Sequence, residues 1–140
     1  MEYRRFGDTI VARLDRGEEI LEQVERITRQ EKLQLASVQA LGAVDSFTVG
    51  VYDTQKKAYR ANHFEGSYEI VSLTGTVDTM QGGFYCHLHM SAGNAEGAVF
   101  GGHLNTARVS ATCELLLREI PGRIDRERDA SIGLNLWRFM

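Results

Sequence analysis

The feature that most constrains the fold is the single stretch of the chain with helical periodicity. An apolar stripe at helical spacing is formed by four residues: Ile20, Leu21, Val24 and Ile27. We therefore expect one amphipathic helix over residues 16–31, with this stripe against the core. Asp15 is the expected N-cap, and Glu18, three residues later, is its expected reciprocal acid.

After this helix the sequence has the character of β-structure. Apolar or alternating runs suited to strands cover residues 3–14, 35–41, 44–52, 59–64, 68–77, 84–90, 107–120 and 132–139. We expect Gly42 and Gly75 to interrupt two of these runs, and the polar residues 53–57 to form a hairpin turn. Many strands and one helix predict a single α+β domain over residues 1–140. Its sheet should be largely antiparallel and barrel-like, with the helix packed against it.

Three of the four histidines lie close together in the sequence. His87 and His89 are two residues apart on the predicted strand 84–90, so their side chains should point to the same face. His103 follows the glycine pair Gly101–Gly102, which allows a close backbone approach. Neutral imidazole is the commonest zinc ligand, and three protein ligands leave a fourth position open. A solvent-exposed face of three ordinary histidines is the alternative.

Composition limits the classes of function. The net charge of −3 argues against a strong nucleic-acid binder, which usually has a basic excess. Both cysteines, Cys86 and Cys113, lie in apolar runs and are expected to be buried free thiols. No apolar run reaches the length of a membrane span or a signal core, so we expect a soluble cytoplasmic protein with no membrane partner.

The last part of the chain mixes charges and aromatic residues. Candidate phosphate-binding arginines are Arg4, Arg5, Arg123, Arg126 and Arg128. Acidic residues alternate with the later three, so segment 123–129 is expected to be a solvated face. Residues 132–139 are expected to close the sheet, with Trp137 and Phe139 in the core or at a subunit interface.

Three segments of the chain resemble a known family, the PPC (plants and prokaryotes conserved) domain. Residues 66–75 resemble the plant stretch Gly-Arg-Phe-Glu-Ile-Leu-Ser-Leu-Ser-Gly, and residues 40–44 resemble its Ile-Gly-Ala-Val segment. His87-Leu88-His89 with Gly101-Gly102-His103-Leu104 resembles the histidine pattern of stand-alone prokaryotic members, often labelled PD1-like predicted DNA-binding proteins. The resemblance implies a homotrimer. It also implies that His87, His89 and His103 bind a divalent metal, with zinc as the expected ion.

The chain departs from the plant members in two respects. Ser67 stands where the plant stretch has arginine, and the minor-groove AT-hook core Arg-Gly-Arg-Pro is absent. Because of Ser67, the contact made by the plant arginine is not expected here, and the missing AT-hook weakens the expectation of DNA binding, although the family label still includes it.

The sequence leaves competing functions open. The first is a trimeric metal-binding PPC protein with a DNA-binding, regulatory or small-ligand role, in which an anionic ligand takes the open metal position. The alternative is a hydrolase-like or cupin-like enzyme that uses metal-bound water, with Glu96 or Glu114 as general base. Candidates for orienting the histidine rings or lining a ligand pocket are Asn94, Glu96, Asn105 and Glu114.

Overall fold

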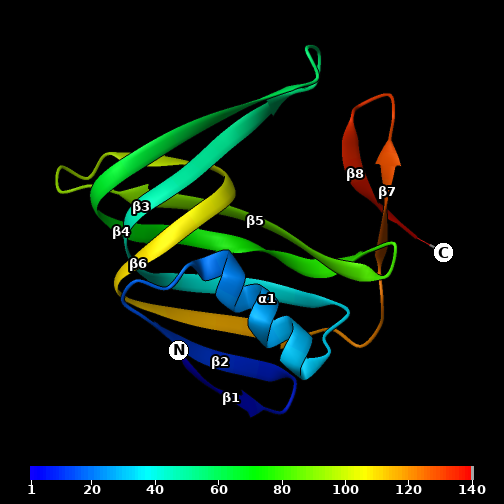
Figure 1. The fold of residues 1–140 in the computed structure, drawn as a ribbon, viewed down its shortest axis with the longest axis horizontal. Coiled ribbons are helices and arrows are strands. Elements are labelled where there is room, and N and C mark those ends of the chain that lie inside the picture. The colour runs from blue at the N-terminus through cyan, green and yellow to red at the C-terminus, as the bar shows by residue number, and fades with distance from the viewer. Residues whose placement is uncertain (140) are drawn as a thin grey trace.

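A computed structural model describes residues 1–139 and shows eight strands and one helix (Figure 1). The elements in chain order are β1 (Glu2–Phe6), β2 (Thr9–Asp15), α1 (Ile20–Glu31), β3 (Ala36–Asp53), β4 (Ala58–Met80), β5 (Gly83–Gly93), β6 (Val99–Glu119), β7 (Asp125–Asp129) and β8 (Leu134–Arg138). The predicted α+β class is confirmed. No helix among these residues is long and apolar enough to span a bilayer.

Four long strands form a closed circuit. β3 pairs with β4, β4 with β5, β5 with β6 and β6 with β3, and all four pairings are antiparallel. β2 adds to the other end of β6, and β1 adds to β2. Closure gives these four strands partners on both sides over much of their length and so limits unpaired edges. The barrel-like prediction therefore holds for the central strands.

The helix begins later than predicted. α1 starts at Ile20, and its N-cap is Glu19 rather than Asp15, so the predicted cap is wrong. Gly17 donates a backbone hydrogen bond to Val109 on β6, which holds the preceding residues in a non-helical path. The Glu18 side chain still accepts a hydrogen bond from the backbone N–H of Asp15. This is the bond expected of the reciprocal acid in a helix capping box, although the helix itself starts later. Ile20, Val24 and Ile27 of the apolar stripe are buried, as predicted, Leu21 is partly buried, and α1 packs against β5 and β6.

Neither glycine breaks its strand, so the two expected interruptions are wrong. β3 continues through Gly42, beside a register shift between Ala40 and Ala43, and β4 continues through Gly75. A Cβ atom on Gly75 would lie 2.0 Å from the carbonyl oxygen of His87 on β5. The glycine is needed because the backbones of β4 and β5 approach closely there, not because the chain turns.

The last two strands form a hairpin beside the barrel (Figure 1). β7 pairs parallel with β4 at only two positions, and β8 pairs with β7. Segment 123–129 is therefore not simply a solvated face: Arg126 is only 8% exposed. Trp137 and Phe139 are 42% and 76% exposed, so the core prediction for them is wrong. Cys113 is buried and Cys86 half-buried, and both are free thiols.

Candidate metal centre

The strand β5 carries the first two histidines. His87 and His89 alternate with Leu88 and Met90, which are 1% and 2% exposed and belong to the core. The alternation places the two imidazoles together on the opposite face of the strand. β4 pairs with β5 along this stretch, opposite both histidines, so backbone hydrogen bonds fix their spacing.

The third histidine comes from β6, directly across from the second. His103 is the Cα partner of His89, at the end of the β5–β6 pairing. On its other side His103 is the partner of Gly50 on β3. A Cβ on the preceding residue, Gly102, would lie 2.5 Å from the carbonyl oxygen of Gly50, so only glycine fits there. The glycine pair noted in the sequence thus allows β3 and β6 to approach and bring His103 to the cluster.

The three imidazoles face one another. One ring nitrogen from each lies within 4.8 Å of the others, and His87 Nε2 is 3.2 Å from His89 Nε2. Ring centroids are 5.1 to 5.7 Å apart. Tetrahedral zinc with nitrogen ligands at 2.0–2.1 Å requires nitrogens about 3.3 Å apart. The donor set suits zinc, and the His87–His89 nitrogen pair already has this spacing, whereas the three nitrogens together lie within 4.8 Å of one another.

The surroundings lower the pKa of two of the imidazoles, those of His87 and His103, and so favour their neutral form. Burial lowers the pKa of His87 from 6.5, and the neighbouring charges of His103 and Arg126 lower it further. Burial likewise lowers the pKa of His103, with a smaller contribution from His89. A neutral imidazole has a free lone pair for a metal, so fewer protons compete with the metal at neutral pH.

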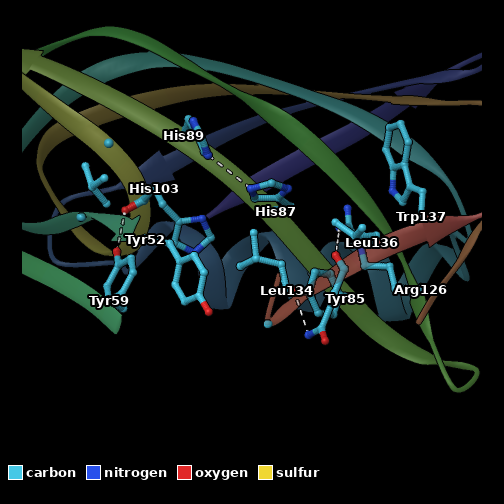
Figure 2. A pocket seen from close by; sticks show the side chains of 15 residues that line it. Tyr52, Tyr59, Tyr85, His87, His89, His103, Arg126, Leu134, Leu136 and Trp137 are labelled. Carbon is cyan, nitrogen blue, oxygen red and sulfur yellow. Dashed lines mark hydrogen bonds between the residues drawn. The ribbon is translucent and has the colours of Figure 1, made fainter. Parts of the chain in front are cut away.

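The histidines open onto a cavity of about 710 Å³ (Figure 2). Its lining comes from the six strands β3 to β8 and the β7–β8 turn: Gly50, Val51, Tyr52, Tyr59, Tyr85, His87, His89, Gly102, His103, Arg126, Gly133, Leu134, Asn135, Leu136 and Trp137. Apart from the histidines and Arg126, the lining is mainly aromatic and aliphatic. Such a cavity has the size and character of a small-molecule site.

The hairpin contributes residues that the sequence reasoning did not place near the histidines. Arg126 donates from Nε and from an Nη to the two carboxylate oxygens of Asp78, each at 2.7 Å. Trp137 Nε1 donates to the same carboxylate at 2.7 Å, and Arg126 also reaches the carbonyl oxygen of Asn135. Arg126 stands in a run of alternating charges, so no local pattern separates it from its exposed neighbours.

The four predicted supporting residues lie in different places. Asn94 and Glu96 are in the β5–β6 turn, where the Asn94 side chain accepts from the backbone of Glu96, and neither lines the cavity. Glu114 lies further along β6 and lines other hollows. Of the four, Asn105 is linked most directly to the histidines. Its Oδ1 accepts a hydrogen bond from the Tyr59 hydroxyl at 2.5 Å, and the Tyr59 ring packs edge-on against His103.

Comparisons with known proteins agree with this arrangement. The family model of the Plants and Prokaryotes Conserved (PCC) domain matches residues 1–121. Among curated proteins, the bifunctional protein GlmU of a Synechococcus strain is 29% identical over 86% of this chain. The chain spans about a fifth of the length of the curated relatives it matches.

Solved structures extend the likeness over nearly the whole chain. A metal-containing protein of Archaeoglobus fulgidus is 34% identical, with a TM-score of 0.89 over 99% of this chain and 97% of its own. A PPC protein of Pyrococcus horikoshii is 32% identical, with a TM-score of 0.86 over 99% and 94%. A "putative dna binding protein" of Bacteroides thetaiotaomicron is 25% identical, with a TM-score of 0.96 over 99% and 96%. The chain therefore belongs to the Plants and Prokaryotes Conserved (PCC, also written PPC) domain family.

Proposed function

We propose that this protein binds a divalent metal, zinc, through His87, His89 and His103, and acts as a metal-dependent ligand-binding or regulatory module. The observation that carries the proposal is the convergence of three imidazole nitrogens within 4.8 Å at the wall of a cavity. The similar protein of Archaeoglobus fulgidus, described as metal-containing, supports it. Three imidazole ligands leave one zinc position for water or a ligand.

Binding fits the cavity better than hydrolysis does. A metal-bound water acting as nucleophile is usually assisted by a general base within hydrogen-bond reach. The described residues that line the cavity include no aspartate or glutamate. Glu96 and Glu114, the bases expected for an enzyme, lie outside the lining. We therefore favour a binding function over metal-dependent hydrolysis.

The test is metal analysis of the purified, tag-free protein. We expect about one zinc per chain in the wild type and almost none in His89→Ala. His63→Ala is the matched control, because His63 is exposed on β4 and bonds Thr48 and Glu65 rather than the cluster. A wild type that stays empty after growth with added zinc would refute the proposal, as would equal metal in His89→Ala.

We also propose that the chain forms a homotrimer. Exposed apolar side chains gather on neighbouring strands β2, β3, β4 and β6: Val11, Leu41, Val71 and Leu116. Three of them surround one hollow, and a copy of this chain is the proposed occupant. Light scattering coupled to size exclusion should give three times the chain mass, and Leu41→Lys should lower it. A wild-type monomer would contradict the proposal.

DNA binding is a second candidate, supported by the printed description of the Bacteroides thetaiotaomicron protein. The structure reduces the expected contacts, because Arg5 pairs with Glu31 and Glu119 and Arg126 is buried. Within residues 1–139, Arg4 and Arg128 have no acidic partner. Fluorescence anisotropy against salt would test this, since affinity falls with a log–log slope of about −0.9 per phosphate contacted. Absence of binding even at low salt would remove this candidate.

A further inference from the structure

The hairpin β7–β8 forms the wall of the cavity opposite the histidines and is attached at both ends. At its base, Arg126 bonds Asp78 on β4. At its tip, the Tyr52 hydroxyl donates to the carbonyl oxygen of Ile132 at 3.0 Å. Because one attachment is on β4 and the other on β3, the hairpin spans the cavity as a fixed wall.

A divalent metal bound by the three histidines would leave the cavity with an excess of positive charge. Three neutral imidazoles add no charge, so a divalent ion keeps its full charge of two. The lining residues within the described chain include no carboxylate. Arg126, the one charged side chain of the lining apart from any protonated histidine, is already neutralised by Asp78. An anion from solution is therefore the natural fourth ligand.

The rest of the cavity lining is mainly apolar, so it favours an anion that carries an apolar group. In the close-up view Leu134 lies between Tyr52 and Tyr85, below His87 (Figure 2). Leu136 and Trp137 continue the same wall beyond Leu134. A ligand whose polar end reaches the histidines would place its other end against these side chains, and burial of apolar surface contributes roughly 25 cal/mol per Å².

We propose that the cavity binds a small monocarboxylic acid with an aromatic or branched aliphatic body, its carboxylate on the metal and its body against the hairpin. This inference rests on the metal site proposed above. It assigns the hairpin the role of setting the size and polarity of the ligand. The hairpin follows residue 121, where the match to the family model ends.

The first experiment compares ligands on the zinc-loaded protein by calorimetry. Phenylacetate and isovalerate test the proposal, acetate lacks the apolar body, and phenylacetamide lacks the charge. We expect phenylacetate or isovalerate to bind about tenfold or more tightly than acetate, and phenylacetamide to bind too weakly to measure. Equal binding of the amide, or of acetate, would overturn the inference.

A second measurement separates this inference from the metal proposal. Protein loaded with cobalt(II) should change its visible absorption when the carboxylate binds, and metal-free protein should lose affinity for the acid. If the metal binds with the expected stoichiometry but neither acid alters the spectrum, only the carboxylate inference fails. If no metal binds, the proposed function itself fails.

A matched pair of variants tests the role of the hairpin. Leu134→Asp places a negative charge in the wall and should weaken phenylacetate binding about tenfold or more, because like charges repel. Leu134→Asn has nearly the same shape without the charge and should weaken it less. Val99→Asp adds the same charge at an exposed position outside the cavity and should leave affinity unchanged. Metal content is measured in all three, and equal loss in the Asp and Asn variants would contradict the charge argument.

Discussion

The two walls of the cavity are built in different ways. His87, His89 and His103 stand on β5 and β6 within the closed circuit of strands, where backbone hydrogen bonds fix their positions. The facing hairpin pairs with the barrel at only two backbone positions and depends otherwise on side chains. The difference teaches that the arrangement of the histidines is a property of the barrel, whereas the position of the facing wall depends on a few side-chain attachments.

The side-chain attachment of the hairpin is a buried ion pair. The side chains of Arg126 and Asp78 are 6% and 0% exposed. The Asp78 carboxylate accepts four hydrogen bonds, two from Arg126, one from Trp137 and one from the Thr76 hydroxyl, so its buried charge is well satisfied. The guanidinium also stacks on the ring of Tyr85, 4.5 Å from its centroid. Trp137 is the single tryptophan of the chain, so its fluorescence reports on the hairpin alone.

The largest effect should follow from breaking this ion pair. Asp78→Asn leaves Arg126 buried without a countercharge and should cost about 3–5 kcal/mol, most of it in attachment of the hairpin. Hydrogen exchange of β7 and β8 should accelerate and Trp137 fluorescence should shift to the red, while β5 and β6 stay protected. Asp45→Asn is the control, because the exposed Asp45–Arg108 pair is screened by solvent and should contribute far less than the buried pair. Simultaneous loss of barrel and hairpin protection would show that the two walls are one unit.

Zinc binding should stabilise the barrel strands that carry the histidines more than it stabilises the hairpin. At free zinc about a hundredfold above Kd, binding to the folded state alone stabilises by about 2.7 kcal/mol. We expect a rise in Tm on zinc addition, with exchange slowed mainly in β5 and β6 around His89 and His103. His89→Ala should show no rise, and His63→Ala should behave as wild type. Slowing of exchange confined to the hairpin would contradict the assignment of the metal to the barrel.

A smaller effect is expected at the tip of the hairpin. Tyr52→Phe removes the hydrogen bond to the carbonyl oxygen of Ile132 and should weaken tip attachment by about 1 kcal/mol. Exchange near the β7–β8 turn should accelerate with zinc affinity unchanged. Tyr59→Phe is the matched control, because Tyr59 bonds Asn105 and the carbonyl oxygen of His103 instead. If Tyr59→Phe loosened the turn equally, the assigned tip contact would be wrong.

The smallest effect concerns acid pH. Hydrogen bonding by Thr79 lowers the pKa of Asp125 at the base of the hairpin from 3.8, and hydrogen bonding by Ser131 lowers that of Asp129 at its turn. A lowered folded-state pKa contributes stability above 3.8, and this is lost as pH falls through the lower folded value. Trp137 fluorescence should therefore begin to change below about pH 4, and Asp129→Asn should flatten the change. A transition unaffected by that substitution would exclude Asp129 as its source.

Sequence patterns predicted the parts of the fold that depend on local periodicity. The helix stripe, the hairpin turn after β3 and the shared face of His87 and His89 follow from spacings of 3.6 and 2 residues. The expected N-cap at Asp15 is wrong because β6 captures the preceding backbone. The expected breaks at Gly42 and Gly75 are wrong because glycine there allows close backbone approach rather than a turn.

The sequence by itself determined the class of the fold, the shared face of His87 and His89 and the family resemblance, because each depends on short-range spacing, whereas strand pairing placed His103 beside them. Only the tertiary structure decided what faces the histidines. Arg126 and Asp78 are far apart in the chain, and in the sequence each has the character of a surface charge. The pairing of β7 with β4 brings them together and buries both. The hairpin wall depends on pairings between distant segments, and local periodicity carries no information about such pairings.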